Sequence, residues 1–270
     1  MSINFASRLI KLLPFGLSLA AEVKPLYLIF VILTGAAAGF LINYLADVLP
    51  QTRHLSKPQC PECETPYSDK AYLLLRKCPK CGRKRSLRTY IVLIVTNLAS
   101  VLLQFFPFAG LSFLATLPLL IFLGTVVVID VEHRLVLAET SLFGIFLCLF
   151  YGIILRNPMN TLLGGLNGLL IMLFFYVLGI VFSFIVGKLQ GKSIKEVAFG
   201  FGDVTAGTFL GLLSGWPGIL GAIILALLIF AGFTILLLLG LILTKRYRAF
   251  TNAQPFVPFL ILGAIIMFYL

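Results

Sequence analysis

The chain has 270 residues, of which 60% are hydrophobic and only 11% are charged. Soluble domains carry roughly 25% charged residues, so this chain has too few polar groups to cover a surface in water. A soluble globular enzyme is therefore excluded. The apolar residues come in long runs, which predicts an all-α polytopic membrane protein with about eight transmembrane helices and one small aqueous insert.

The charges are unequal, with 21 Lys and Arg against 10 Asp and Glu and a net charge of +11. In a membrane protein such an excess first reports on topology, because cytoplasmic loops collect Lys and Arg. No stripe of arginines and aromatic residues suited to base stacking is present, so we expect the lipid bilayer and no nucleic acid as a partner.

Residues 1–24 carry Arg8, Lys11 and Lys24 around a short apolar stretch. This pattern favours a segment that lies at the membrane interface. A cleaved signal peptide that ends near residues 18–20 is the first alternative, because a basic start and a short apolar core also fit a leader. Plain disorder is the second.

The first transmembrane helix is expected over residues 25–49, and a polar insert follows over residues 50–89. Residues 90–270 are expected to form the main membrane domain. A Pro-Gly turn at residues 215–218 should separate two of its spans. The spans predicted within it lie at about 90–106, 111–129, 140–155, 161–187, 203–214, 219–243 and 256–270.

Alternation of these spans places the insert on the same side as the loops 130–139, 188–202 and 245–255. Together they hold 17 of the 21 basic residues. The positive-inside rule therefore predicts that these loops face the cytoplasm and that the amino terminus lies outside.

Four of the five cysteines form two C-x-x-C pairs, Cys60 with Cys63 and Cys78 with Cys81, separated by fourteen residues. Two such pairs at this spacing are typical of a zinc site. Four sulfur ligands would close a tetrahedral shell, which makes the ion structural and not catalytic. Two disulfides or free thiols are the alternatives, and a reducing cytoplasm disfavours disulfides. Cys148 lies in an apolar span and is expected to be a core residue.

Two of the ten carboxylates, Asp130 and Asp203, mark the membrane boundary on the side predicted to be cytoplasmic. Asp130 ends an apolar run, and Asp203 follows Gly200-Phe201-Gly202 and opens an apolar helix. Close carboxylates do not both ionise easily, so one can hold a proton while the other activates water. The pair therefore fits an aspartic protease. The structural alternative is that each aspartate only caps a helix or marks its edge.

Two other function classes stay open on the residues alone. Intramembrane acids often mark ion paths, which would suit a transporter or channel, although these two acids lie at the boundary and not near the midplane. A non-catalytic assembly scaffold would use the insert for docking and would need neither aspartate. The chain has no H-E-x-x-H and no G-x-S-x-G motif, so zinc protease and serine hydrolase readings lack support.

Over about residues 26–270 the chain resembles the prepilin peptidase (type IV leader peptidase) family of intramembrane aspartic proteases. Five segments are similar to family motifs and occur in the right order. They are Gly39-Phe40-Leu41-Ile42-Asn43 with Leu49-Pro50, the two C-x-x-C pairs, Ile129-Asp130, Gly200-Phe201-Gly202-Asp203, and the segment Pro255-Phe256-Val257-Pro258-Phe259-Leu260.

The resemblance implies a membrane-embedded endopeptidase that removes the basic leader from type IV prepilins, or from the pseudopilins of type II secretion. Cleavage would occur at the cytoplasmic face of the bacterial inner membrane, with Asp130 and Asp203 as the catalytic pair. It also implies a structural zinc ion held by the four paired cysteines. Many members then methylate the new amino terminus with S-adenosylmethionine.

Several positions depart from the family pattern. Leu137-Ala138-Glu139 stands where the family has L-P-D, Thr205 replaces a Lys, and Arg88-Thr89-Tyr90 only loosely follows the segment after the zinc insert. The aspartate chemistry does not depend on these positions. Methyl transfer is the activity that they bring into question.

Further residues are candidates for shaping the site. Gly200 and Gly202 would let backbone approach closely, either to a substrate strand or to an opposing helix. Glu132, His133 and Glu139 could contact a basic leader or tune the aspartates. For each of these three the alternative is a solvated loop position.

Overall fold

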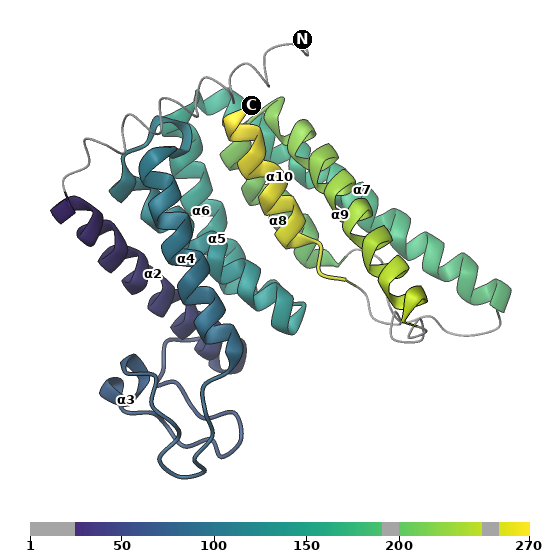
Figure 1. The fold of residues 1–270 in the computed structure, drawn as a ribbon. Coiled ribbons are helices and arrows are strands. Elements are labelled where there is room, and N and C mark those ends of the chain that lie inside the picture. The colour runs from purple at the N-terminus through teal and green to yellow at the C-terminus, as the bar shows by residue number, and fades with distance from the viewer. Residues whose placement is uncertain (1–24, 191–199, 245–253) are drawn as a thin grey trace. The chain divides into compact units, whose positions relative to one another are not determined.

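The computed structural model describes residues 25–190, 200–244 and 254–270. The interfacial segment or signal peptide expected over residues 1–24 lies outside the described residues. Within them the regular structure is helical, with no strand and one isolated bridge between Gln59 and Pro66. The predicted all-α fold is confirmed (Figure 1).

Eight helices occupy the positions where apolar runs predict spans, and a ninth, α3, lies in the insert. The ends of these eight helices lie within a few residues of the predicted ends. The described elements are α2 (Pro25–Thr52), α3 (Asp69–Leu73), α4 (Leu87–Phe105), the 3-10 turn η1 (Phe108–Gly110), α5 (Phe113–His133), α6 (Ala138–Leu155), α7 (Pro158–Gln190), α8 (Phe201–Ser214), α9 (Gly218–Leu243) and α10 (Val257–Tyr269).

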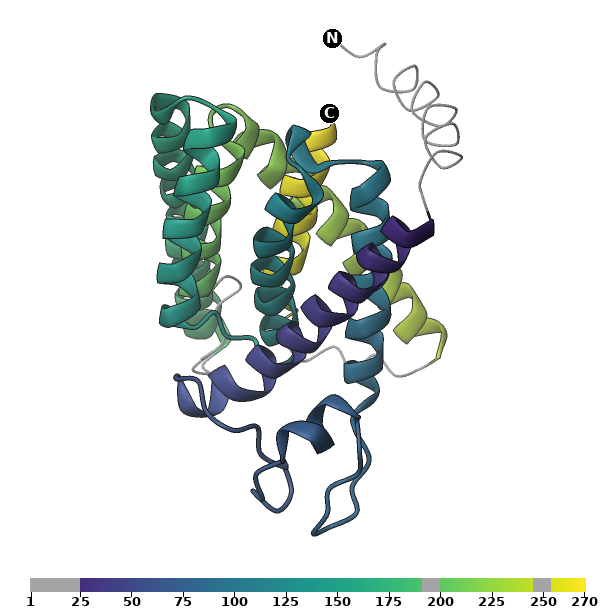
Figure 2. The ribbon, with the colours of Figure 1, turned by 90° about the vertical axis from the view of Figure 1, so that its left-hand side faces the viewer.

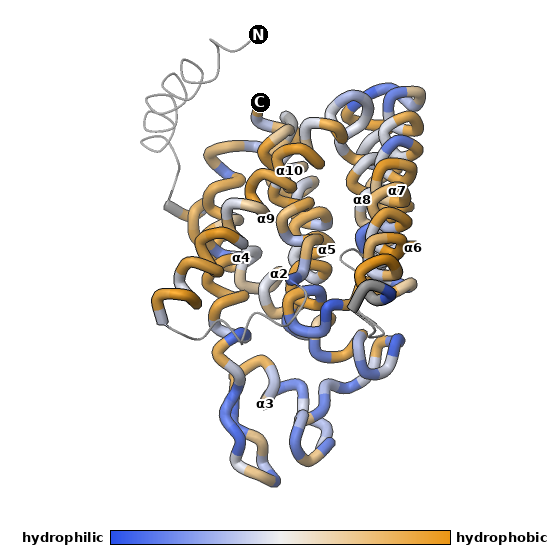
Figure 3. The backbone as a smooth tube through the Cα atoms, turned by 90° about the vertical axis from the view of Figure 1, so that its right-hand side faces the viewer, coloured by the Kyte–Doolittle hydropathy of each residue, from blue (hydrophilic) through white to orange (hydrophobic). Residues whose placement is uncertain are grey.

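Six of these helices, α2, α4, α5, α6, α7 and α9, are long and apolar enough to cross a membrane. The other two are shorter, since α8 has 14 residues and α10 has 13. At 1.5 Å per residue, 14 residues extend about 21 Å, which is less than the roughly 30 Å of a hydrocarbon core. The chain is a membrane protein with six candidate spans, and Figure 3 shows the apolar colouring of its helices beside the polar insert.

The chain divides into two compact units, with the boundary between Val128 and Ile129 inside α5. In the first unit α2 packs along α4. Small residues allow this close approach, because a side chain at Gly39 would meet Leu93 at 3.0 Å. The buried amide of Asn43 on α2 donates to the carbonyl of Gly39 at 3.0 Å and to that of Thr89 on α4 at 3.2 Å. This cross-helix bond is the packing role expected of an amide in an apolar span.

The second unit is organised around α8, which packs against α6, α7, α9 and α10. Glycines bring α7 and α8 into backbone contact. A Cβ at Gly168 would lie 2.1 Å from the carbonyl oxygen of Gly207, and one at Gly211 would lie 2.3 Å from that of Gly164. Figure 2 shows the teal and green helices of this unit side by side. The short helix α8 is therefore held on all sides.

Candidate functional site

Asp203 lies in the first turn of α8 with 9% of its surface exposed. Gly200 is the residue that precedes the helix, and its backbone N–H donates to Oδ2 of Asp203 at 2.7 Å. In return the N–H of Asp203 donates to the carbonyl of Gly200 at 3.0 Å. This reciprocal pair satisfies backbone groups that a helix start otherwise leaves unpaired, and the helix dipole favours negative charge there.

Asp130 lies in the last turn of α5 and is 5% exposed. The helix continues to His133, one turn beyond the predicted end of the span, because the residues after the aspartate keep helical bonding. The backbone N–H of Val257, at the start of α10, donates to the Asp130 carboxylate. The other oxygen, Oδ2, is buried without a hydrogen-bond partner in the described part of the chain. A buried carboxylate oxygen without a partner is costly, so this atom has an unmet hydrogen bond that a water molecule or a substrate group would satisfy.

The fold brings the two aspartates together within the second unit. Asp203 is among the groups whose charge acts on Asp130, so the two carboxyl groups lie within interaction range of each other. Each is held by one backbone N–H, from Val257 and from Gly200. Two buried acids fixed in this way can share a proton, and that is the arrangement needed for acid–base chemistry on water.

Of the two glycines in the Gly200-Phe201-Gly202 segment, Gly202 is the one where a side chain would clash with its neighbours. A Cβ at Gly202 would lie 2.9 Å from both Cβ and Cγ2 of Val136, in the loop between α5 and α6. At Gly200 an added Cβ would meet nothing closer than 3.9 Å. Within the described chain only Gly202 makes the predicted close approach, and Gly200 acts through its backbone N–H; an approach of substrate backbone to either glycine stays a prediction.

Thr205 stands where the prepilin peptidase pattern has a lysine, and its hydroxyl forms hydrogen bonds within α8 and to α6. Its hydroxyl donates to the carbonyl of Gly202 at 2.9 Å and accepts from the hydroxyl of Ser141 on α6 at 3.1 Å. Ser141 is 6% exposed. This bond joins α6 to the turn of α8 that carries Asp203, and nothing in the sequence pattern pointed to it.

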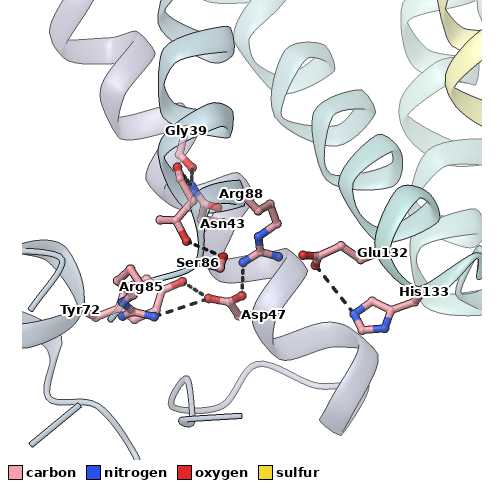
Figure 4. Close-up of polar contacts among 10 residues, drawn as sticks. Gly39, Asn43, Asp47, Tyr72, Arg85, Ser86, Arg88, Glu132 and His133 are labelled. Atoms are coloured by element: carbon pink, nitrogen blue, oxygen red, sulfur yellow. Dashed lines mark hydrogen bonds and ion pairs between the residues drawn. The ribbon is translucent and has the colours of Figure 1, made fainter. Parts of the chain in front are cut away.

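The other three predicted site residues lie at the surface of the second unit. Glu132, His133 and Glu139 are all exposed. Nε2 of His133 is 4.0 Å from Oε2 of Glu132, so these two interact with each other (Figure 4). Their exposure leaves these side chains accessible to a bound peptide.

The four paired cysteines converge in the insert, with their sulfur atoms all within 4.8 Å of one another. Sγ of Cys60 is 3.6 Å from that of Cys81, and Sγ of Cys63 is 3.5 Å from that of Cys78. Sulfurs at about 2.3 Å from a tetrahedral ion would be about 3.8 Å apart, so this spacing fits a metal such as zinc. The cysteines form no disulfide.

The two C-x-x-C pairs fold as matching turns. The N–H of Cys60 donates to the carbonyl of Thr65 at 3.0 Å, and the N–H of Cys78 donates to that of Arg83 at 2.9 Å. The residue after each pair, Glu64 or Gly82, has a positive φ, of 53° and 71°. The backbone N–H of Glu62 lowers the pKa of the Cys60 thiol to about 6, against the opposing effect of burial. A thiol that ionises readily is suited to be a metal ligand.

A second polar cluster, missed by the sequence analysis, joins the insert to the two helices that flank it (Figure 4). Asp47 near the end of α2 accepts from the hydroxyl of Tyr72 at 2.6 Å and pairs with Arg88 at the start of α4. Nη1 of Arg85 lies 3.9 Å from Asp47. Asp47 is not part of any site predicted from the sequence, and the basic residues served there only as a topology signal.

The family comparison bears on the second unit and the end of the first. Residues 117–235 match the model of the type IV leader peptidase family. The matched range contains both Asp130 and Asp203, and it excludes the cysteines and the Pro255–Leu260 segment. No curated protein and no solved structure matches the chain. The family implies a peptidase, and the long apolar helices place it in a membrane.

Proposed function

We propose that the chain is a leader peptidase in which Asp130 and Asp203 form one catalytic pair. The observation that carries the proposal is the convergence of these two buried carboxyl groups from the end of α5 and the start of α8. Burial excludes bulk water and keeps the two acids coupled, so that one proton can be shared between them. An aspartate that merely capped a helix would not need a second buried acid within interaction range.

The chemistry follows from the two environments. The ionised carboxylate takes a proton from a water molecule as its oxygen attacks the scissile carbonyl carbon. The protonated carboxyl gives its proton to the carbonyl oxygen, which forms a tetrahedral diol. Collapse of the diol breaks the C–N bond: the aspartate that took the water proton gives it to the leaving nitrogen, and the other aspartate takes a proton from a diol hydroxyl, which returns the pair to its starting state. The unpartnered Oδ2 of Asp130 is the oxygen available to water or substrate.

The substrate that we propose is a type IV prepilin or a pseudopilin, with a basic leader followed by an apolar helix. Such a helix could enter the bilayer beside the second unit while the leader stays in the aqueous phase. The exposed carboxylates of Glu132 and Glu139 have the charge that would attract a basic leader. By the positive-inside rule cleavage would take place at the cytoplasmic face of a bacterial inner membrane, with the amino terminus of the enzyme outside.

We propose zinc as the metal of the four cysteines. The sulfur-only donor set and the near-tetrahedral spacing favour Zn²⁺ over ions that prefer oxygen ligands. Four sulfurs leave no open coordination position, so the ion would stabilise the insert and take no part in hydrolysis. The activity proposed for the chain is proteolysis, and methyl transfer with S-adenosylmethionine stays a prediction from the resemblance.

The test is leader removal in membranes from cells that co-express the chain with a prepilin. Asp130→Asn and Asp203→Asn should each leave the precursor uncut, because either change removes one half of the acid–base pair. Asp69→Asn, at an exposed position in the first turn of α3, is the matched control and should process normally. Full processing by either of the first two variants would favour a transporter or a non-catalytic scaffold instead.

A further inference from the structure

Arg85 is the most deeply buried cation of the insert, with 9% of its side chain exposed. Its guanidinium carbon lies 4.1 Å from the ring centroid of Tyr67 and 4.2 Å from that of Tyr72. The rings themselves are 6.2 Å apart and tilted edge-on. Stacking of this kind suits the planar guanidinium and would not hold a lysine as well.

The positive charge of Arg85 is only partly compensated by the side chains around it. The nearest carboxylate, on Asp47, is 3.9 Å away and is shared with Tyr72 and Arg88. Nε and Nη2 of Arg85 are buried and have no hydrogen-bond partner among the described residues. A buried cation needs a compensating negative charge nearby, because its desolvation otherwise costs several kcal/mol by general estimates.

Tyr67 also packs against the cysteine cluster. Tyr67 and Tyr72 share one buried core with Cys60 and Cys78, and the Tyr67 hydroxyl interacts with the Cys60 sulfur. Four sulfur ligands around one divalent ion would carry a net charge of −2, so a loaded cluster would be a negative group beside the ring of Tyr67 on which Arg85 stacks.

We infer that Arg85, with Tyr67, is an outer-shell residue of the metal site that favours the metal-loaded form of the cysteine cluster. Because Arg85 also faces Asp47 on α2, the same contacts link metal loading to the junction of α2 and α4. Tyr67 contacts both the guanidinium of Arg85 and the core that contains Cys60. The inference rests on the proposed binding of zinc and not on the proposed peptidase activity.

The experiment uses the full chain, purified in detergent micelles and loaded with zinc, and measures zinc release to a chromophoric chelator. Arg85→Gln is compared with Lys84→Gln, which removes the same charge from the exposed neighbouring position. Mutation of an outer-shell residue typically lowers metal affinity about 10- to 100-fold. Arg85→Gln should therefore bind zinc at least about 10-fold more weakly than Lys84→Gln, and Lys84→Gln should match the unaltered chain.

A second pair of variants gives a test without a change of charge, in case Arg85→Gln does not fold. Tyr67→Phe keeps the ring and removes the hydroxyl, whereas Tyr44→Phe removes a hydroxyl that donates to the carbonyl of Ser56 instead. Zinc should leave Tyr67→Phe several-fold faster than Tyr44→Phe. Hydrogen exchange at residues 86–92 should rise in Arg85→Gln with zinc bound and in the unaltered chain after chelation.

The outcomes separate this inference from the proposals on which it builds. Zinc release from Arg85→Gln and Tyr67→Phe at the rates of their controls would overturn the outer-shell role while leaving zinc binding intact. Failure of the unaltered chain to retain zinc would overturn both. Peptidase activity does not enter either readout, so an inactive chain would leave the result interpretable.

Discussion

Asp203 is held against the backbone N–H of Gly200, 2.7 Å away and three residues earlier in the chain. This contact fixes the carboxylate at the start of α8, a helix that is surrounded by four others. Asp130 is held in a similar way by the N–H of Val257 at the start of α10. Both acids are therefore positioned by backbone groups, which neither titrate nor change rotamer.

Gly202→Ala should reduce leader cleavage strongly, whereas Gly200→Ala should reduce it much less. The reason is that a methyl group at Gly202 would lie 2.9 Å from Val136, while at Gly200 it would meet nothing closer than 3.9 Å and the N–H that binds Asp203 would remain. Overpacking of this kind costs about 1–3 kcal/mol and would displace the first turn of α8. Cleavage rates of the purified variants check this.

The same pair of positions supplies its own control. Val136→Ala combined with Gly202→Ala should recover most of the lost activity, because the shorter side chain leaves room for the added methyl group. If the double variant stays as impaired as Gly202→Ala alone, the steric explanation is wrong.

Thr205→Val should lower kcat with little change in KM, and Thr205→Ser should restore it. Valine keeps the shape of threonine but removes the hydroxyl that binds Gly202 and Ser141. A neutral hydrogen bond contributes about 0.5–1.5 kcal/mol, so a loss of up to about 10-fold is expected. Steady-state kinetics on a prepilin substrate would show it. Equal rates for the valine and serine variants would mean that the bond does not position Asp203.

Gly211→Ala should destabilise the second unit. Its added methyl group would lie 2.3 Å from the carbonyl oxygen of Gly164, so α7 and α8 would have to separate. Gly232→Ala on α9 is the control, because nothing lies within 4 Å of its added Cβ. Thermal unfolding in detergent should show a clear drop in midpoint for the first variant and none for the second. Similar midpoints would contradict the close packing of α7 on α8.

Cys78→Ser should abolish retention of zinc, whereas Cys148→Ala should not affect it. Cys78 is one of the four converging sulfurs, and Cys148 is a buried core residue on α6 outside the cluster. Removal of one ligand opens the tetrahedral shell and leaves three thiols to compete with protons. Elemental analysis of the purified chains checks this, and one zinc per chain in both variants would rule out the four-cysteine site.

Much of the fold was predictable, because long apolar runs define membrane helices with few alternatives. The spans, the turn near Pro217 and the cysteine convergence all followed from local pattern. The ends were less well predicted: α5 runs on to His133 and α2 to Thr52, since polar residues can extend a helix past the apolar core. Hydropathy alone carries no information about these last turns.

The two aspartates stood out because carboxylates are scarce, and their positions at the end of α5 and the start of α8 agree with the prediction. The groups that hold them could not be foreseen. The N–H of Val257 is a backbone donor from a distant segment, and any residue except proline would offer one. Asp47 and Arg85 likewise combine only in three dimensions, because they are 38 positions apart in the sequence.

The most direct test of the central claim is the single-turnover cleavage rate of a purified prepilin by Asp130→Asn, Asp203→Asn and the double variant. Residues that act as one unit are not additive, so each single variant should lose at least about 10³-fold and the double variant should be no worse. Hydrogen exchange along α7 and α8 should confirm that all three are folded. A folded single variant that cleaves within about 10-fold of the unaltered chain would contradict the paired-aspartate mechanism.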